Sequence, residues 1–278
     1  MNHLIQRTLV AIPATLVISA VCVEAAFAQI DYRNLDEGRP VRTEDAYPVE
    51  RHSFELVVPY IYENERGPGR SHLVAPELAY GIAANTMVGL KLPFTALDGG
   101  AGVDTRWGFG GPRFFGLYNF NTESPKLPAF ALRADASIPF GNLAGDHVSG
   151  ALSAIATRSW GRTRAHINAT VGLGPEPAVS EALPVHAMPS WGAGAALDRT
   201  FLRSSLVVIA ELTLREAIGE TITEVSAGLG ARMQLTPTLV LDAGLERRLT
   251  REAGTDIGLT IGLTHAFALA GLMPAGPR

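Results

Sequence analysis

The sequence predicts an all-β protein: a transmembrane, antiparallel, up-and-down β-barrel of about twelve strands. Three features predict it: an N-terminal export signal, apolar residues that recur with a period of two, and strand connections that alternate between short and long. The mature chain contains no apolar run close to the ~20 residues that a membrane-spanning helix needs. A soluble β-sandwich also alternates, so the connections and the placement of the aromatic residues must decide between the two classes.

Residues 1–28 have the pattern of a cleaved secretory signal peptide. Arg7 supplies the positive charge, residues 9–21 form the apolar stretch, and Ala26-Phe27-Ala28 is a small-x-small cleavage site. An uncleaved membrane anchor is disfavoured, because the apolar stretch is short and contains Pro13. We therefore expect export through the periplasm to the outer membrane of a Gram-negative cell.

Composition excludes several classes of function. The single cysteine, Cys22, lies within the signal, so the mature chain offers neither a disulfide framework nor a thiolate metal site. The chain has 23 basic and 27 acidic residues, a balance that gives no footprint for nucleic acid. No phosphate-binding loop, dinucleotide glycine motif or paired-histidine metal helix is present. We expect no cofactor, no metal and no nucleic-acid partner.

The alternation is clearest near the C-terminus. In residues 256–267 the odd positions, from Ile257 to Phe267, are mostly apolar, whereas the even positions carry Asp, Gly, Thr and Ala. Residues 164–173 alternate in the same way. The segments with this pattern, each about as long as a tilted membrane strand, are 52–63, 71–82, 86–95, 110–120, 129–139, 149–160, 163–174, 189–199, 204–215, 222–233, 238–249 and 254–267.

The connections between these segments alternate as periplasmic turns and outer loops do. Tight connections are predicted at 83–85, 161–162, 200–203 and 234–237. Longer ones, rich in Gly, Pro and charge, are predicted at 64–70, 96–109, 140–148 and 175–188. Three depart from the rule: 121–128 is a long turn, and 216–221 and 250–253 are short outer loops.

Aromatic residues gather at the predicted strand ends, where a bilayer meets water. The periplasmic set is Tyr80, Phe120, Trp160, Phe201 and Phe267, and the outer set is Tyr62, Phe94, Phe140 and Trp191. The closing strand, Thr260 to Phe267, resembles the C-terminal recognition signal of outer-membrane barrels, which implies the barrel-assembly machinery as a partner during biogenesis. A tail of residues 268–278 follows the predicted barrel, which spans 51–267.

Parity predicts which side chains face the lumen. Because a charge on the lipid face costs about 2–4 kcal/mol at the bilayer midplane, charged positions should point inward. The lumen-lining candidates are Glu55, Glu77, Lys91, Arg133, Asp135, Arg164, His166, Asn168, Glu211, Arg215, Glu224, Arg232, Asp242, Glu246 and Arg248. Strands 110–120 and 149–160 have ambiguous parity and contribute none. These charges could form a conduit that selects solutes, or they could pair and plug the barrel.

His166 and residues 29–50 bear on what occupies the interior. His166 is interpreted as a member of a hydrogen-bonded network rather than a metal ligand, since no second histidine lies at ligand spacing. Residues 29–50 have mixed charge and no alternation. They are either a disordered periplasmic lead or a plug or gate that folds into the lumen.

Several stretches resemble a known family. Gly38-Arg39-Pro40-Val41-Arg42-Thr43-Glu44-Asp45-Ala46 and Ser53-Phe54-Glu55-Leu56 are similar to the opening of barrels of the MetA-pathway phenol-degradation family. Pro76-Glu77-Leu78-Ala79-Tyr80-Gly81-Ile82, Arg164-Ala165-His166-Ile167-Asn168 and the turn and strand from Leu235 to Gly244 also resemble that family. The resemblance implies an outer-membrane barrel linked to uptake of small organic compounds, aromatic ones among them.

We therefore expect a monomeric channel for passive passage of small organic solutes, embedded in outer-membrane lipid and not an enzyme. One alternative is a sealed structural barrel without transport. Another is an outer-membrane lipid hydrolase, because His147-Val148-Ser149-Gly150 is similar to the His-x-Ser-Asn motif of outer-membrane phospholipases and deacylases, with Gly150 in place of Asn.

Overall fold

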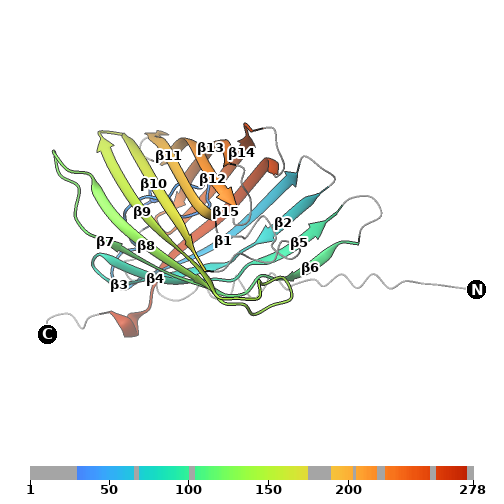
Figure 1. Cartoon of the computed structure of the whole chain (residues 1–278). Coiled ribbons are helices and arrows are strands. Elements are labelled where there is room, and N and C mark those ends of the chain that lie inside the picture. The colour runs from blue at the N-terminus through green and yellow to red at the C-terminus, as the bar shows by residue number, and fades with distance from the viewer. Residues whose placement is uncertain are drawn as a thin grey trace, which may run out of the picture.

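The computed structural model describes residues 30–65, 69–99, 104–174, 189–202, 205–217, 223–250 and 255–273. The predicted signal peptide, 1–28, and tail residues 274–278 lie outside the described residues. The regular elements of the described chain are strands, apart from one short 3₁₀ turn, η3 (Ala270–Leu272), after the last strand (Figure 1). No helix in the described ranges is long and apolar enough to cross a membrane.

The strands form one sheet. They are β1 (Ser53–Glu65), β2 (Arg70–Val74), β3 (Glu77–Ala83), β4 (Thr86–Lys91), β5 (Phe94–Asp98), β6 (Arg106–Phe109), β7 (Arg113–Asn119), β8 (Ala129–Ser137), β9 (Ser149–Trp160), β10 (Thr163–Leu173), β11 (Pro189–Phe201), β12 (Leu206–Ala217), β13 (Thr223–Thr236), β14 (Leu239–Arg248) and β15 (Thr255–Ala268).

The sheet closes into a barrel because β15 pairs antiparallel with β1, from Ser53 opposite Ala268 to Glu65 opposite Thr255. Its 15 segments make 12 strands, since β2 and β3, β4 and β5, and β6 and β7 are each one interrupted strand. Pro76, Pro93 and Pro112 lie at the three interruptions, where proline cannot donate a ladder hydrogen bond. The predicted twelve-stranded antiparallel barrel is confirmed.

One predicted connection is wrong in part. The loop expected at 96–109 contains the end of β5 and all of β6, which pair with each other from Phe94 opposite Phe109 to Leu97 opposite Arg106. Gly110-Gly111-Pro112 consists of turn residues, so the sequence predicted that the strand begins there, but in the structure the strand begins at Arg106. On its other side β6 contacts a loop, where the Leu143 N–H donates to the Phe109 carbonyl at 3.1 Å.

The two faces of the barrel differ as a bilayer requires. Large apolar side chains point outward, such as Ile167 and Leu229, which are 62% and 60% exposed. Charged side chains point inward, and Arg133 and Arg232 are 1% and 0% exposed. Soluble proteins bury apolar groups instead, so this inverted arrangement fits a barrel whose outer surface meets lipid.

We call the two ends of the barrel the turn end and the loop end. The turn end carries both chain termini of the barrel and the short connections, including that between β9 and β10 at Gly161. Outward-facing rings stack there: the centroids of Phe54 and Tyr80 are 4.5 Å apart, and those of Phe54 and Phe267 are 5.3 Å apart. Aromatic rings at a barrel rim are typical of membrane barrels.

The structure assigns the parity of the two ambiguous strands. In β7 the odd residues face inward, among them Phe115 and Leu117, and in β9 Ile155 faces inward while Trp160 faces outward. The inward apolar residues pack in one buried cluster with Ala46 and its neighbours from the N-terminal segment. Parity could not be read from the sequence because the interior is apolar at this level of the barrel.

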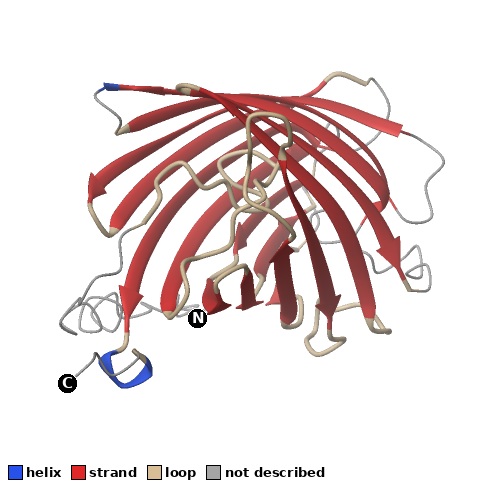
Figure 2. Ribbon diagram, turned by 90° about the vertical axis from the view of Figure 1, so that its left-hand side faces the viewer, coloured by secondary structure: helices blue, strands red, loops and turns tan. Residues whose placement is uncertain are grey.

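The N-terminal segment, Ile30 to Glu50, lies inside the barrel, and we call it the inner segment (Figure 2). It enters at the turn end, where the Ile30 N–H donates to the Pro237 carbonyl at 3.0 Å. It reverses direction at Gly38, whose φ of +83° favours glycine. It then returns to the turn end, where the Glu50 carbonyl accepts from the Ser53 N–H at the start of β1.

Candidate functional site

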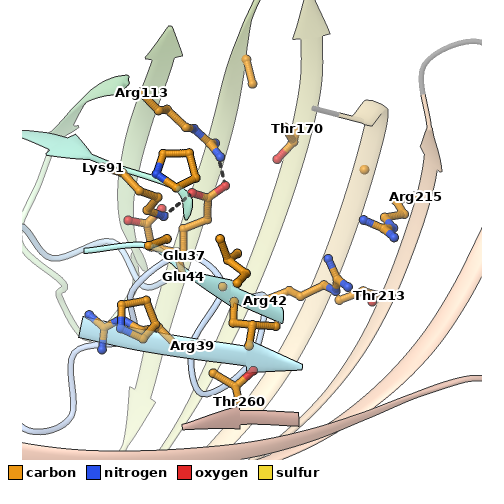
Figure 3. Close-up of a pocket in the computed structure, with 18 of the residues that line it drawn as sticks. Glu37, Arg39, Arg42, Glu44, Lys91, Arg113, Thr170, Thr213, Arg215 and Thr260 are labelled. Atoms are coloured by element: carbon orange, nitrogen blue, oxygen red, sulfur yellow. Dashed lines mark hydrogen bonds and ion pairs between the residues drawn. The ribbon is translucent and has the colours of Figure 1, made fainter. Parts of the chain in front are cut away.

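A cavity of ≈ 350 Å³ lies between the inner segment and the loop end (Figure 3). Residues 37–44 of the inner segment form its floor, and Asp146 and His147 lie at its rim. Apolar residues from β1, β2 and the break at Pro93 line one wall. The opposite wall is polar. It includes Asn168 and Thr170 of β10, which lies six strands from β1 around the barrel.

Two wall residues hold the backbone of the floor. The Glu211 carboxylate accepts the N–H groups of Arg42 and Thr43, both at 2.9 Å, and the Thr43 hydroxyl at 2.8 Å. The Asn168 side chain accepts the Glu44 N–H at 2.7 Å and donates to the Glu44 carbonyl at 2.9 Å. Wall side chains therefore replace the strand partner that this stretch lacks, so its polar backbone can be buried.

Arg42 crosses the cavity floor. Its Nε donates to Glu246 of β14 at 2.6 Å, and its Nη2 reaches Glu63 of β1 at 3.4 Å. The side chain is 30% exposed, more than that of any other ion-paired arginine among the described residues. In Figure 3 the Arg42 side chain extends toward Arg215 of β12, which pairs with Glu224 at 2.7 Å.

Glu37, at the tip of the inner segment, collects three cations. Arg113 contacts its carboxylate at 2.8 Å and Lys91 contacts it at 3.3 Å (Figure 3). Arg133 also contacts it at 3.3 Å. Arg133 lies deeper, with Glu44 at 2.8 Å. The tip is thus tied to strands β4, β7 and β8 by charge.

Two further ion-pair groups lie below the floor. Arg39 contacts Asp242 at 3.0 Å and Asp36 at 2.7 Å. Arg164 contacts Asp45 at 3.1 Å and Asp198 at 2.7 Å. An unpaired charge in a low-dielectric interior is energetically costly, and these ion pairs avoid that cost for the buried side chains of the wall.

At the turn end the inner segment contacts the β7–β8 turn. The Tyr47 hydroxyl donates to Glu123 at 3.2 Å. Burial, together with the Glu123 carboxylate, raises the pKa of Tyr47 to about 12, so the hydroxyl stays protonated and remains a donor.

The Arg133→Gln variant is expected to be less stable by about 3–5 kcal/mol, since it leaves the buried Glu44 carboxylate without its cation and leaves Asp135 with Arg113 alone. Urea unfolding of the barrel, followed by tryptophan fluorescence, measures the loss. Arg158→Gln is the control, because this exterior arginine pairs with Glu123 and donates to the carbonyls of Ser124 and Pro125 near the surface, where water replaces the lost contacts at lower cost. Equal midpoints for the two variants would contradict the expectation.

All fifteen lumen-lining candidates face the interior. Those in contact with the inner segment are Glu55, Lys91, Arg133, Arg164, Asn168, Glu211, Arg232, Asp242 and Glu246. The others have partners in the wall: Glu77 with Lys91, Asp135 with Arg113, His166 with Asp198, and Arg215 and Arg248 with Glu224.

His166 belongs to a buried network, with Asp198 on one ring nitrogen and Thr157 on the other, both at 3.0 Å. No group of metal-ligating side chains occurs among the described residues.

Sequence reasoning missed several partners. Asp198 is directly opposite Arg164 across the β10–β11 ladder, so a search for opposite charges in cross-strand register would have found it. Arg113 was missed because its strand had no assigned parity. Glu63 shares the inward parity of Glu55 and could have been read from the same strand.

The side chains of His147 and Ser149 are not hydrogen-bonded to each other in the described structure. Both residues line the cavity. Ser149 faces the lumen rather than the lipid. A hydrolase acting on bilayer lipid needs its nucleophile on the outer surface, beside an activating base.

No protein-family model and no curated protein matches the sequence. Solved structures do match. An outer membrane channel from Pseudomonas putida F1 is similar over 84% of this chain and 100% of its own, with 14% identity and a TM-score of 0.62. The KdgM porin, solved in complex with disordered oligogalacturonate, covers 76% of this chain and 99% of its own (9%, TM-score 0.51). The NanC porin covers 76% and 98% (7%, 0.51). This chain shares their barrel fold.

Proposed function

We propose that the protein is an outer-membrane channel for passive passage of small organic solutes, aromatic ones included. The observation that carries the proposal is the ≈ 350 Å³ cavity at the loop end, lined by apolar side chains on one wall and polar ones on the other. Its size falls in the lower part of the range of ligand pockets, about 300–1,000 Å³. No covalent chemistry is part of the proposed function.

Three features support an outer-membrane location. The apolar outer surface and the stacked rings at the turn end suit a bilayer. The fold is shared with proteins described as an outer membrane channel and as porins.

A single chain closes the barrel through β1 and β15, so a monomer suffices for passage. The resemblance to the MetA-pathway phenol-degradation family supports small organic compounds as the solute class.

The inner segment acts as a gate in this proposal. Its apolar residues fill the turn end, since Leu35 and Val41 pack with Val207 and Ile209 of β12. A solute in the cavity can cross to the other side only if the inner segment shifts. The same packing favours a second candidate, a sealed structural barrel in which the segment never moves.

Solute flux into liposomes tests the proposal. The refolded mature protein is reconstituted, and entry of neutral aromatic compounds, sugars and small anions is compared with entry into empty liposomes. We expect faster entry of the small organic compounds. Folding is verified by heat-modifiable mobility in gels.

The absence of any flux in a folded preparation would contradict the proposal and leave the sealed barrel. Lipid hydrolysis that is lost in Ser149→Ala would instead establish the hydrolase.

A further inference from the structure

The cavity offers unused hydrogen-bond donors at one residue. A guanidinium has five N–H donors. Arg42 uses Nε at 2.6 Å on Glu246 and one weak contact of Nη2 at 3.4 Å on Glu63. In the described structure no acceptor contacts its Nη1, and the side chain is 30% exposed. Several charged donors therefore face the cavity.

The carboxylates of the cavity floor and deeper walls are already paired or buried. Glu37, whose side chain is 33% exposed, is contacted by three cations, and Glu246 by Arg42 itself. Glu63, Glu77 and Glu211 are buried, with 5–7% of each residue exposed. Asp146, an exposed carboxylate, lies at the rim. A solute that reaches the floor thus meets free donors rather than free acceptors.

The wall beside Arg42 is apolar. Pro59 and Ile61 of β1, Leu73 of β2 and Pro93 line the cavity next to Glu63, which Arg42 contacts. The hydroxyls of Thr170 and Thr213 lie on the opposite wall. A ligand that fits both surfaces has an apolar body and a compact polar head.

We propose that Arg42 binds the head group of an amphipathic organic carboxylate whose apolar body lies against β1, β2 and Pro93. The guanidinium donates to both carboxylate oxygens, and the ligand replaces its weak contact with Glu63. The cavity lining contains seven carboxylates and five cationic side chains, so recognition depends on these local hydrogen bonds rather than on a long-range field. The inference names the solute class of the proposed channel and rests on that function for its role.

Equilibrium dialysis tests the binding step separately from flux. The mature protein in lipid nanodiscs is dialysed against 3-phenylpropanoate, 3-phenylpropanol or 3-phenylpropylamine, and binding to empty nanodiscs is subtracted. The three probes share a body and differ in the charge of the head. We expect the carboxylate to bind most tightly, and Arg42→Gln to weaken its binding about tenfold with little effect on the alcohol.

Glu246→Gln gives a change of opposite sign. It removes the negative charge beside Arg42 and leaves its Nε only a neutral amide oxygen as acceptor. It should therefore tighten 3-phenylpropanoate binding several-fold, and it decides the matter if Arg42→Gln does not fold. Arg158→Gln is the matched control, since it removes an arginine at the exterior turn end.

The inference is overturned if the carboxylate binds no better than the alcohol, if the amine binds best, or if Glu246→Gln leaves carboxylate binding unchanged or weaker. Carboxylate binding without any solute flux would uphold the binding site and reject the channel. Solute flux without a preference for the carboxylate would uphold the channel and reject the binding site.

Discussion

A variant carrying Thr43→Cys and Gly194→Cys is expected to pass solutes only after reduction. Thr43 lies in the cavity floor and Gly194 in the β11 wall, and a Cβ at position 194 would lie 4.0 Å from the Thr43 Cβ. This separation suits a disulfide, whose Cβ atoms are about 3.5–4.5 Å apart. The bond would fix the inner segment to the wall. Flux under oxidising conditions should fall to that of empty liposomes, and dithiothreitol should restore it.

The chain is well suited to this experiment, because its single cysteine, Cys22, lies in the predicted signal peptide. Each single-cysteine variant is the control and should conduct equally in both redox states. Free-thiol titration reports how much of the bond has formed. Undiminished flux through a fully oxidised double variant would mean that solutes pass without movement of the inner segment at this point.

The opposite change, displacement of the floor, is expected in Gly244→Ala. A Cβ at position 244 of β14 would overlap the Pro40 carbonyl oxygen, a backbone atom that cannot rotate away. The wall cannot yield there, since Gly244 is paired with Gly230 on one side and Thr260 on the other. The floor must therefore move, and conductance should rise toward that of a barrel lacking residues 29–50. Planar-bilayer recording of both proteins measures the rise.

Gly116→Ala is the matched control for this variant. Gly116 lies on the outer face of β7, and a Cβ there would meet its nearest atom at an ordinary 3.7 Å. Gly116→Ala adds the same methyl group to a strand residue but does not press on the inner segment. If Gly244→Ala conducted no more than Gly116→Ala, the floor at Pro40 would not limit passage. If removal of residues 29–50 left flux unchanged, the inner segment would not be a gate.

The barrel itself could be predicted from the sequence because the membrane imposes a simple rule on each strand. Lipid on one side and a polar lumen on the other require a period of two. In segments such as 256–267 and 164–173 the Asp and Arg residues stand only at the positions that face the lumen. The same rule placed Arg133, Arg164 and Arg232 in the interior, because a charge facing lipid costs about 2–4 kcal/mol at the midplane. Each of these predictions depends only on residues within a single strand.

The rule failed where the interior is not polar. Phe115 and Ile155 face inward toward Ala46 of the inner segment, so their strands show apolar residues on both faces. The parity of these two strands, and with it the role of Arg113, could be assigned only once the partner inside the barrel was known. Strand breaks at Pro93 and Gly110 hid β6 for a related reason: a local turn signal does not tell whether the sheet resumes beyond it.

By itself, the sequence determined the number of strands, their order and many of the inward charges, because these follow from short-range alternation. Only the tertiary structure decided what fills the lumen. The inner segment has no periodicity, and its contacts reach across the chain, as between Arg39 and Asp242, 203 residues apart. Such contacts depend on barrel closure, which brings β1 and β15 side by side, so no local pattern could reveal that Arg42 lies on a cavity floor.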